Sequence, residues 1–139
     1  MPTNTDHRPG EKPKVKEEGP YGLELVLDLH GCPDETFEPE LLKKACYSIC
    51  KKIGMKAGPF HQWGTRKDED QPTNPKSDGI SSCLFIDTSS ITIHAIDRLM
   101  NCYVNIFSCK MDWDTFEAAK EAQRILGGKI VRHKHITRA

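Results

Sequence analysis

Four hydroxyl side chains crowd a five-residue stretch near the middle of the chain: Thr88, Ser89, Ser90 and Thr92. His94 follows almost at once, so possible nucleophiles and an acid–base group lie close together in the sequence. A serine hydroxyl at a tight strand junction can attack the carbonyl carbon of the preceding residue and convert the amide into an ester. Loss of the serine α-proton and of the ester group then leaves dehydroalanine, which hydrolyses to a pyruvoyl group at a new chain end.

A pyruvoyl group would give the chain the chemistry of an electron sink. Its ketone condenses with a substrate amine and accepts electrons as a carboxylate leaves. Such a reaction needs an acid–base group near the serine and a separate donor that protonates the product carbanion. Serine and threonine are also ordinary residues of exposed strands and turns, so composition and spacing alone leave a purely structural interpretation open.

Six segments with the alternating pattern of β-strands surround this cluster. They fall within residues 21–31, 55–63, 80–87, 90–96, 102–109 and 129–137. Two further segments have apolar residues at helical spacing and need one face of a sheet to cover. The sequence therefore predicts a two-layer α/β sandwich, in which a mainly antiparallel sheet carries two helices on one face.

The first helix is expected within residues 37–54 and should end at Gly54. Its apolar face consists of Leu41, Leu42, Ala45, Ile49 and Ile53. The second helix is expected within residues 112–128, with Asp112 as its N-cap and Gly127 as its stop. Its buried face is expected to consist of Phe116, Ala119 and Leu126.

The chain of 139 residues is expected to hold one domain, from residue 21 to residue 139. Residues 1–20 have almost no large apolar side chain and are predicted to be a disordered tail. Residues 64–79 are charged and rich in turn formers, so they should form an exposed loop, either a lid or an insertion.

Charge and cysteine content exclude several classes of protein. Lysine plus arginine equals aspartate plus glutamate at 20 each, which argues against a nucleic-acid partner. The sequence shows neither a signal peptide nor a run of membrane-spanning length, so we expect a cytoplasmic protein with six reduced cysteines. Two pairs could donate to a metal, Cys46 with Cys50 and His133 with His135, but structural roles are commoner and no metal site is predicted.

The order of several motifs from about Gly22 to the end resembles the prokaryotic S-adenosylmethionine decarboxylase family. These motifs are the strand and turn "LELVLDLHGC", the aromatic "FHQW", the central "GISSCLFIDTSSITIH" and the strand "VNIFSC". The spacing also agrees with that family, because Ser89 stands five residues before His94 and twenty before Cys109. No one motif is decisive, but the ordered set spans nearly the whole predicted domain.

The resemblance implies a role for several residues. Ser89 would become the pyruvoyl group, with the chain cut between Thr88 and Ser89. The neighbouring Ser90 is the alternative candidate for the cleaved serine. His94 would act as acid–base group in cleavage, and Ser81 would orient it. Cys109 would protonate the decarboxylated carbon. The implied assembly is a dimer formed through a sheet edge or face, and the implied product supplies aminopropyl groups for spermidine.

The substrate contacts implied by the resemblance are partly altered. Trp63 would form an aromatic wall for the adenine. In the segment "HAIDR", Ile96 takes the place of the family's stacking tryptophan, and Arg98 takes that of the acidic residue expected to hold the ribose hydroxyls. We therefore expect S-adenosylmethionine as the substrate of a modified pocket. Two alternatives stay open: a pyruvoyl decarboxylase acting on ornithine or arginine, and a non-catalytic binding protein.

Overall fold

The structure, a computed structural model, describes residues 19–66, 74–76 and 78–139. Most of the predicted tail and the central part of the predicted 64–79 loop lie outside the described residues. The elements in chain order are β1 (Gly22–His30), a 3-10 helix η1 (Asp34–Thr36), α1 (Pro39–Lys52), β2 (Phe60–Gly64), β3 (Ile80–Ile86), β4 (Ser89–Ile96), β5 (Asn101–Ser108), α2 (Thr115–Leu126) and β6 (Lys129–Arg138).

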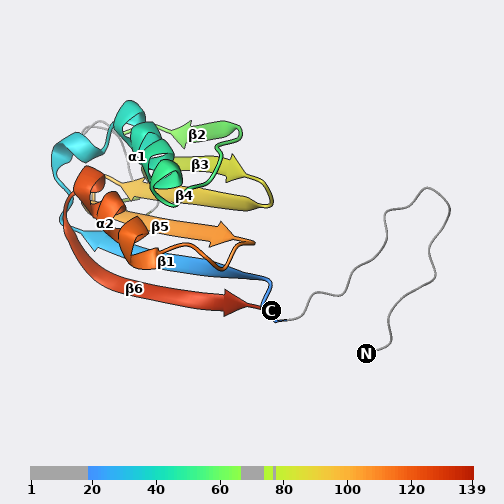
Figure 1. The fold of residues 1–139 in the computed structure, drawn as a ribbon. Helices are drawn as coiled ribbons and strands as arrows, with labels where there is room; N and C mark the ends of the chain where they lie inside the picture. The colour runs from blue at the N-terminus through green and yellow to red at the C-terminus, as the bar shows by residue number, and fades with distance from the viewer. Residues whose placement is uncertain (1–18, 67–73, 77) are drawn as a thin grey trace.

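One six-stranded sheet forms the base of the fold, in the order β2-β3-β4-β5-β1-β6. Every neighbouring pair of strands is antiparallel. Helices α1 and α2 lie side by side on the same face of the sheet, as Figure 1 shows. The predicted two-layer sandwich is therefore confirmed, and the sheet is antiparallel throughout rather than mainly so.

The hydrophobic core lies between the helices and the sheet. Along β4 the residues alternate, so that Ile91, Ile93 and Ala95 are buried under the helices while His94 is exposed. Buried side chains of α1 complete this layer, among them Leu42, Ala45 and Ile49. Among the described residues no helix covers the other face of the sheet, which we call the open face.

The beginning of α2 corrects the predicted N-cap and part of the predicted buried face. Asp114, not Asp112, caps the helix, and its Oδ1 accepts hydrogen bonds from the backbone N–H groups of Phe116 at 2.9 Å and Glu117 at 3.1 Å. This cap places Phe116 on the outer side of the first turn, where it is 64% exposed and stacks on His133 at 4.7 Å. The prediction that Phe116 is buried was therefore wrong.

The remaining predictions for the two helices hold. Ala119 and Leu126 are buried, and α2 ends at Gly127, which has a positive φ of 75°. Helix α1 ends at Lys52, and Gly54 follows with a φ of 72°. None of the helices among the described residues is long and apolar enough to cross a membrane.

Strand β2 is shorter than the segment predicted for it. It begins at Phe60 rather than near residue 55, because the preceding Gly58 and Pro59 interrupt the strand pattern. The interrupted segment still contacts β3 through Gly58, whose N–H donates to the carbonyl of Phe85 at 2.7 Å. Most of β2 is exposed, as fits an edge strand of the sheet.

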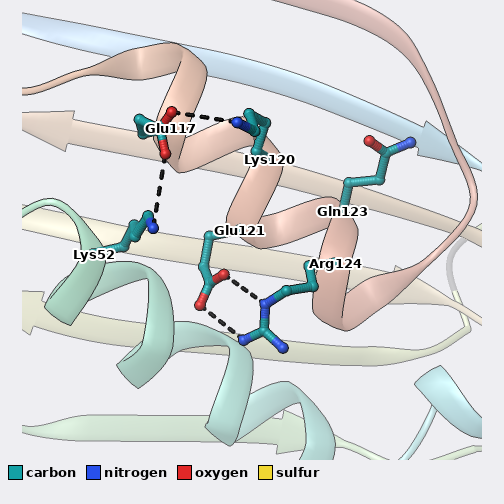
Figure 2. Close-up of a pocket in the computed structure, with 6 residues that line it drawn as sticks. All are labelled: Lys52, Glu117, Lys120, Glu121, Gln123 and Arg124. Carbon is teal, nitrogen blue, oxygen red and sulfur yellow. Dashed lines mark hydrogen bonds and ion pairs between the residues drawn. The ribbon is translucent and has the colours of Figure 1, made fainter.

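The outer surface of the helix layer holds a charged hollow of about 500 Å³ between the end of α1 and α2. Figure 2 shows that its charged side chains pair with one another. Glu117 contacts Lys52 at 3.7 Å and Lys120 at 3.4 Å, and Glu121 accepts two hydrogen bonds from Arg124 at 2.7 and 2.9 Å. These hydrogen bonds from Arg124 and one from Ser48 lower the pKa of Glu121 to about 2. The charges in this hollow therefore have protein partners and connect α1 with α2.

Candidate active site

Ser89 is the first residue of β4 and follows a two-residue turn. Ile86 pairs with Ser89, so Asp87 and Thr88 form the connection between β3 and β4. Thr88 has a φ of +47°, a left-handed conformation that a β-branched side chain rarely adopts. Conformations of this kind cost on the order of 1–3 kcal/mol and cluster at functional sites. The strain lies in the residue whose carbonyl would be attacked by Ser89.

The hydroxyl of Ser89 lies in a small polar cluster, which we call the serine–thiol cluster: Ser89, Ser108 and Cys109. Ser89 is only 6% exposed, and its Oγ donates to the carbonyl of Asp87 at 3.0 Å. The same Oγ accepts from the backbone N–H of Cys109 at 3.3 Å and lies 3.9 Å from the Cys109 thiol. The structure thus brings together two of the predicted site residues, which are twenty positions apart in the sequence.

Ser90, the alternative cleavage position, points to the other face of the sheet. It stands between Phe85 of β3 and Phe107 of β5 in the strand register. The contacts with Cys109 are made by Ser89. The geometry therefore favours cleavage before Ser89 over cleavage before Ser90.

His94 and Ser81 form a second cluster, on the open face of the sheet. The two residues are directly opposite each other on β3 and β4, and Ser81 Oγ lies 2.8 Å from His94 Nδ1. Trp63 stands opposite Ser81 on β2, and Tyr103 stands opposite His94 on β5. A shallow pocket of about 200 Å³ lies over this row. Its lining consists of His61, Gln62, Trp63, Ser81, Ser82, Cys83, Thr92 and His94.

The two clusters do not meet within one chain. Ser89 and His94 lie five residues apart on β4, so alternation places them on opposite faces of the sheet. At about 3.3 Å per residue, their Cα atoms are separated by about 16 Å. A hydrogen bond joins heavy atoms within about 3 Å. His94 therefore cannot act on the Ser89 bond of its own chain in this conformation.

The three predicted substrate-binding residues occupy different positions. Trp63 lines the pocket and is 85% exposed. Ile96 lies on the open face two residues beyond His94, but neither it nor Arg98 is among the residues that line the pocket. Asp97 between them is 7% exposed, and its carboxylate lies 3.7 Å from Arg66 instead of facing the pocket.

Sequence reasoning missed two residues, one at each end of the sheet: Ser108 beside Ser89, and Arg66 just beyond β2. Ser108 lies opposite Ser89, and its hydroxyl is 3.4 Å from Ser89 Oγ. Ser108 is the serine of "VNIFSC", and only the pairing of β4 with β5 reveals that it lies beside Ser89. Arg66 lies within the segment predicted to be an exposed loop, yet it contacts three carboxylates, those of Asp34, Glu38 and Asp97. No local pattern signals that contact.

Among the described residues, no further donors are grouped around Cys46 with Cys50 or around His133 with His135, the two pairs named above as possible metal ligands. In the part of the chain that the structure describes, no three His, Cys, Asp or Glu side chains are grouped to hold a metal ion. Burial raises the pKa of Cys46 to about 12, so this thiol stays protonated. His133 and His135 pack around Phe116 as an aromatic cluster.

Comparisons with known proteins agree on one family. The family described as "S-adenosylmethionine decarboxylase" matches residues 23–139. Two S-adenosylmethionine decarboxylase proenzymes of Clostridium botulinum, from the Langeland type F and Okra type B1 strains, are each 31% identical over 122 residues. Each match covers 84% of this chain and 93% of the relative.

A solved structure shows the same fold. The crystal structure of the adenosylmethionine decarboxylase from Aquifex aeolicus superposes with a TM-score of 0.70 and 15% sequence identity. The match covers 86% of this chain and 92% of that one. The antiparallel sheet with two helices on one face is thus an architecture that a solved decarboxylase also has.

Proposed function

Because the chain belongs to the S-adenosylmethionine decarboxylase family, we propose that it cleaves itself before Ser89 and decarboxylates S-adenosylmethionine. The observation that carries this proposal is the position of Ser89. Its hydroxyl is buried at a strained two-residue turn and contacts the Cys109 thiol. A serine with only a structural role in a turn needs neither the strain at Thr88 nor a neighbouring thiol.

Self-cleavage begins with the hydroxyl of Ser89. Its Oγ attacks the carbonyl carbon of Thr88 through a five-membered ring, the C–N bond breaks, and the amine takes up the hydroxyl proton. Removal of the Ser89 α-proton then expels the Thr88 carboxylate as the new C-terminus of the first fragment. The dehydroalanine left behind tautomerises to an imine, and water releases ammonia from it and leaves the pyruvoyl group.

The fold is suited to survive this cut. The broken bond lies in the turn between β3 and β4, and the two strands remain paired along seven register positions, from Ile80 with Ala95 to Ile86 with Ser89. Strand β4 is also paired with β5 on its other side. The new chain end therefore stays where Ser89 is now.

The residues around Ser89 fit the group that would form there. A pyruvoyl group supplies an electron sink for the departing carboxylate of an amine-bearing substrate. The Cys109 thiol, 3.9 Å from Ser89 Oγ, is suitably placed to deliver a proton to the decarboxylated carbon. Ser108 and the backbone N–H of Cys109 offer polar contacts, and the low exposure of Ser89 limits access of water.

A second copy of the chain would supply the histidine. His94 and Ser81 lie on the open face, about 16 Å from Ser89 along the strand and on the opposite side of the sheet. For His94 to act as acid–base group in cleavage, it has to approach the Ser89 turn of a partner chain. We therefore propose a dimer in which each processing site combines the serine–thiol cluster of one chain with the Ser81–His94 pair of the other.

The pocket beside His94 is the proposed place for the adenosyl part of the substrate. Trp63 offers an exposed indole face on which a purine can stack, and Ser81, Thr92 and His94 offer polar groups beside it. The decarboxylated product would serve as an aminopropyl donor in spermidine synthesis. This assignment follows from the family and from the aromatic wall of the pocket.

Intact mass measurement of the purified protein tests the proposal directly. Wild-type protein should yield two fragments, residues 1–88 and 89–139, and the second should carry a carbonyl that borohydride reduces. The Ser89→Ala variant should give only the 15.7 kDa chain, and Ser90→Ala should still be cleaved. A wild-type chain that remains intact after prolonged incubation would refute the proposal. Release of carbon dioxide from labelled ornithine or arginine, but not from S-adenosylmethionine, would assign a different substrate.

A further inference from the structure

Arg66 connects three segments at the end of the sheet opposite the Ser89 turn. It lies just beyond β2, and its guanidinium forms a two-pronged contact with the carboxylate of Asp34 in η1. It also lies 3.7 Å from Glu38, the N-cap of α1, and 3.7 Å from Asp97 in the turn between β4 and β5. The contacts with Asp34 raise the pKa of Arg66 and lower that of Asp34.

Asp97 is the most buried member of this group. Its side chain is 5% exposed, and among the described residues its Oδ1 has no hydrogen-bond partner. An ionised carboxylate that is removed from water needs an opposite charge close by. Arg66 supplies that charge through Asp97 Oδ2. The position of Arg66 is therefore coupled to that of the β4–β5 turn more strongly than an exposed ion pair would be.

This contact joins the ends of two strands that both line the proposed substrate pocket, β2 and β4. Trp63 precedes Arg66 by three residues on β2, an edge strand that is largely exposed and offers the indole little packing. His94 of β4 also lines the pocket, and it precedes Asp97 by three residues. Strand β3 separates β2 from β4 in the sheet, so the contact between Arg66 and Asp97 is a second connection across β3.

We propose that Arg66 is a positioning residue that fixes the indole of Trp63 relative to His94, on the β4 side of the pocket, through its contact with Asp97. The proposal rests on the function proposed above and adds a determinant of substrate specificity to it. Arg66 does not touch the substrate in this arrangement. It restrains the chain just after the end of β2. That restraint sets the distance between Trp63 on β2 and His94 on β4.

Steady-state kinetics of the processed enzyme with S-adenosylmethionine provide the first test. Arg66→Ala should raise KM by about fivefold or more while kcat changes little, because binding geometry is lost and the serine–thiol cluster is untouched. Arg66→Lys keeps the positive charge and should raise KM less than Arg66→Ala does. If Arg66 acts through the indole, the double variant Trp63→Ala/Arg66→Ala should match Trp63→Ala within about twofold in KM. Additive effects of the two substitutions would overturn the proposal, as would an unchanged KM in Arg66→Ala.

Arg124 offers a matched control, since it also binds a carboxylate with two hydrogen bonds. Its partner is Glu121 in the charged hollow of Figure 2, and neither residue lines the pocket beside His94. Arg124→Ala should leave KM unchanged. A rise in KM as large as that of Arg66→Ala would show that loss of any such ion pair weakens binding, and the proposal would fail.

Amide hydrogen exchange tests the restraint without any turnover. In the Ser89→Ala chain, Arg66→Ala should speed exchange in residues 60–64, and Arg124→Ala should not. Equal exchange in both variants would overturn the proposal. An uncleaved and inactive wild-type protein would instead refute the proposed function, and the exchange experiment would still decide whether Arg66 restrains β2.

Discussion

Co-production of two inactive variants should restore self-cleavage if each processing site is built from two chains. The two variants are Ser89→Ala, which lacks the nucleophile, and His94→Ala, which lacks the acid–base group. Each alone should remain largely intact. In a mixed dimer, the His94→Ala chain retains its own Ser89 and receives His94 from its partner, so that chain should be cut.

The size of the effect follows from the geometry and from random pairing. Ser89 and His94 of one chain are about 16 Å apart along β4 and lie on opposite faces, which is far beyond hydrogen-bond reach. His94 therefore cannot assist cleavage before Ser89 of its own chain in this fold. When equal amounts of the two variants pair at random, about half of the His94→Ala chains have a Ser89→Ala partner, so about half should be cleaved.

Mass spectrometry distinguishes the products, because the two variants differ in mass. The fragment of residues 89–139 should carry the His94→Ala change, and the Ser89→Ala chain should remain at full length. A His94→Ala chain that stays uncut in the mixture, although mixed dimers are shown by tagged pull-down, would refute the two-chain site. Cleavage of His94→Ala on its own at the wild-type rate would show instead that His94 takes no part in processing.

Three further predictions concern the site and its support. The Cys109→Ala chain should still cleave itself but should lose activity progressively during turnover. Without the thiol, which lies 3.9 Å from Ser89 Oγ, the carbanion would be protonated at the wrong carbon. Constant activity over many turnovers would assign the proton donor elsewhere. Trp63→Ala should raise KM for S-adenosylmethionine about tenfold, equivalent to about 1.4 kcal/mol, and an unchanged KM in steady-state assays would remove the indole from the pocket. Glu121→Gln should destabilise the fold at neutral pH in urea titrations. The pKa of Glu121 is lowered to about 2 in the fold, so its contribution to stability is present above its ordinary pKa and disappears as pH falls toward 2. The difference in free energy of unfolding between variant and wild type should therefore shrink over this range. A difference that stays constant would contradict the assigned ion pair.

The position of the turn at Ser89 and the class of the fold could be predicted from the sequence. Strand alternation and helical spacing are local patterns, and they are enough to predict six strands and two helices that cover one face. The predicted N-cap of α2, Asp112, lies two residues before the observed one, because Asp112 and Asp114 are equivalent as local signals. In the fold it is Asp114 whose side chain accepts the N–H groups of Phe116 and Glu117, and the helix that begins after it buries Ala119 and Leu126. The exposed position of Phe116 follows from that start of the helix.

What the sequence by itself determined is the set of chemical groups and their order along the chain. Ser89, His94 and Cys109 could be named from residue type and spacing together with the family resemblance. Only the tertiary structure decided which of them meet, since the pairing of β4 with β5 brings Cys109 to Ser89 across twenty residues. The two-residue period of a strand turns His94 to the opposite face, five residues along. Proximity in sequence does not bring His94 to Ser89 within one chain. It also gives no sign of the contacts of Arg66, whose partners lie on three segments that the fold alone brings together.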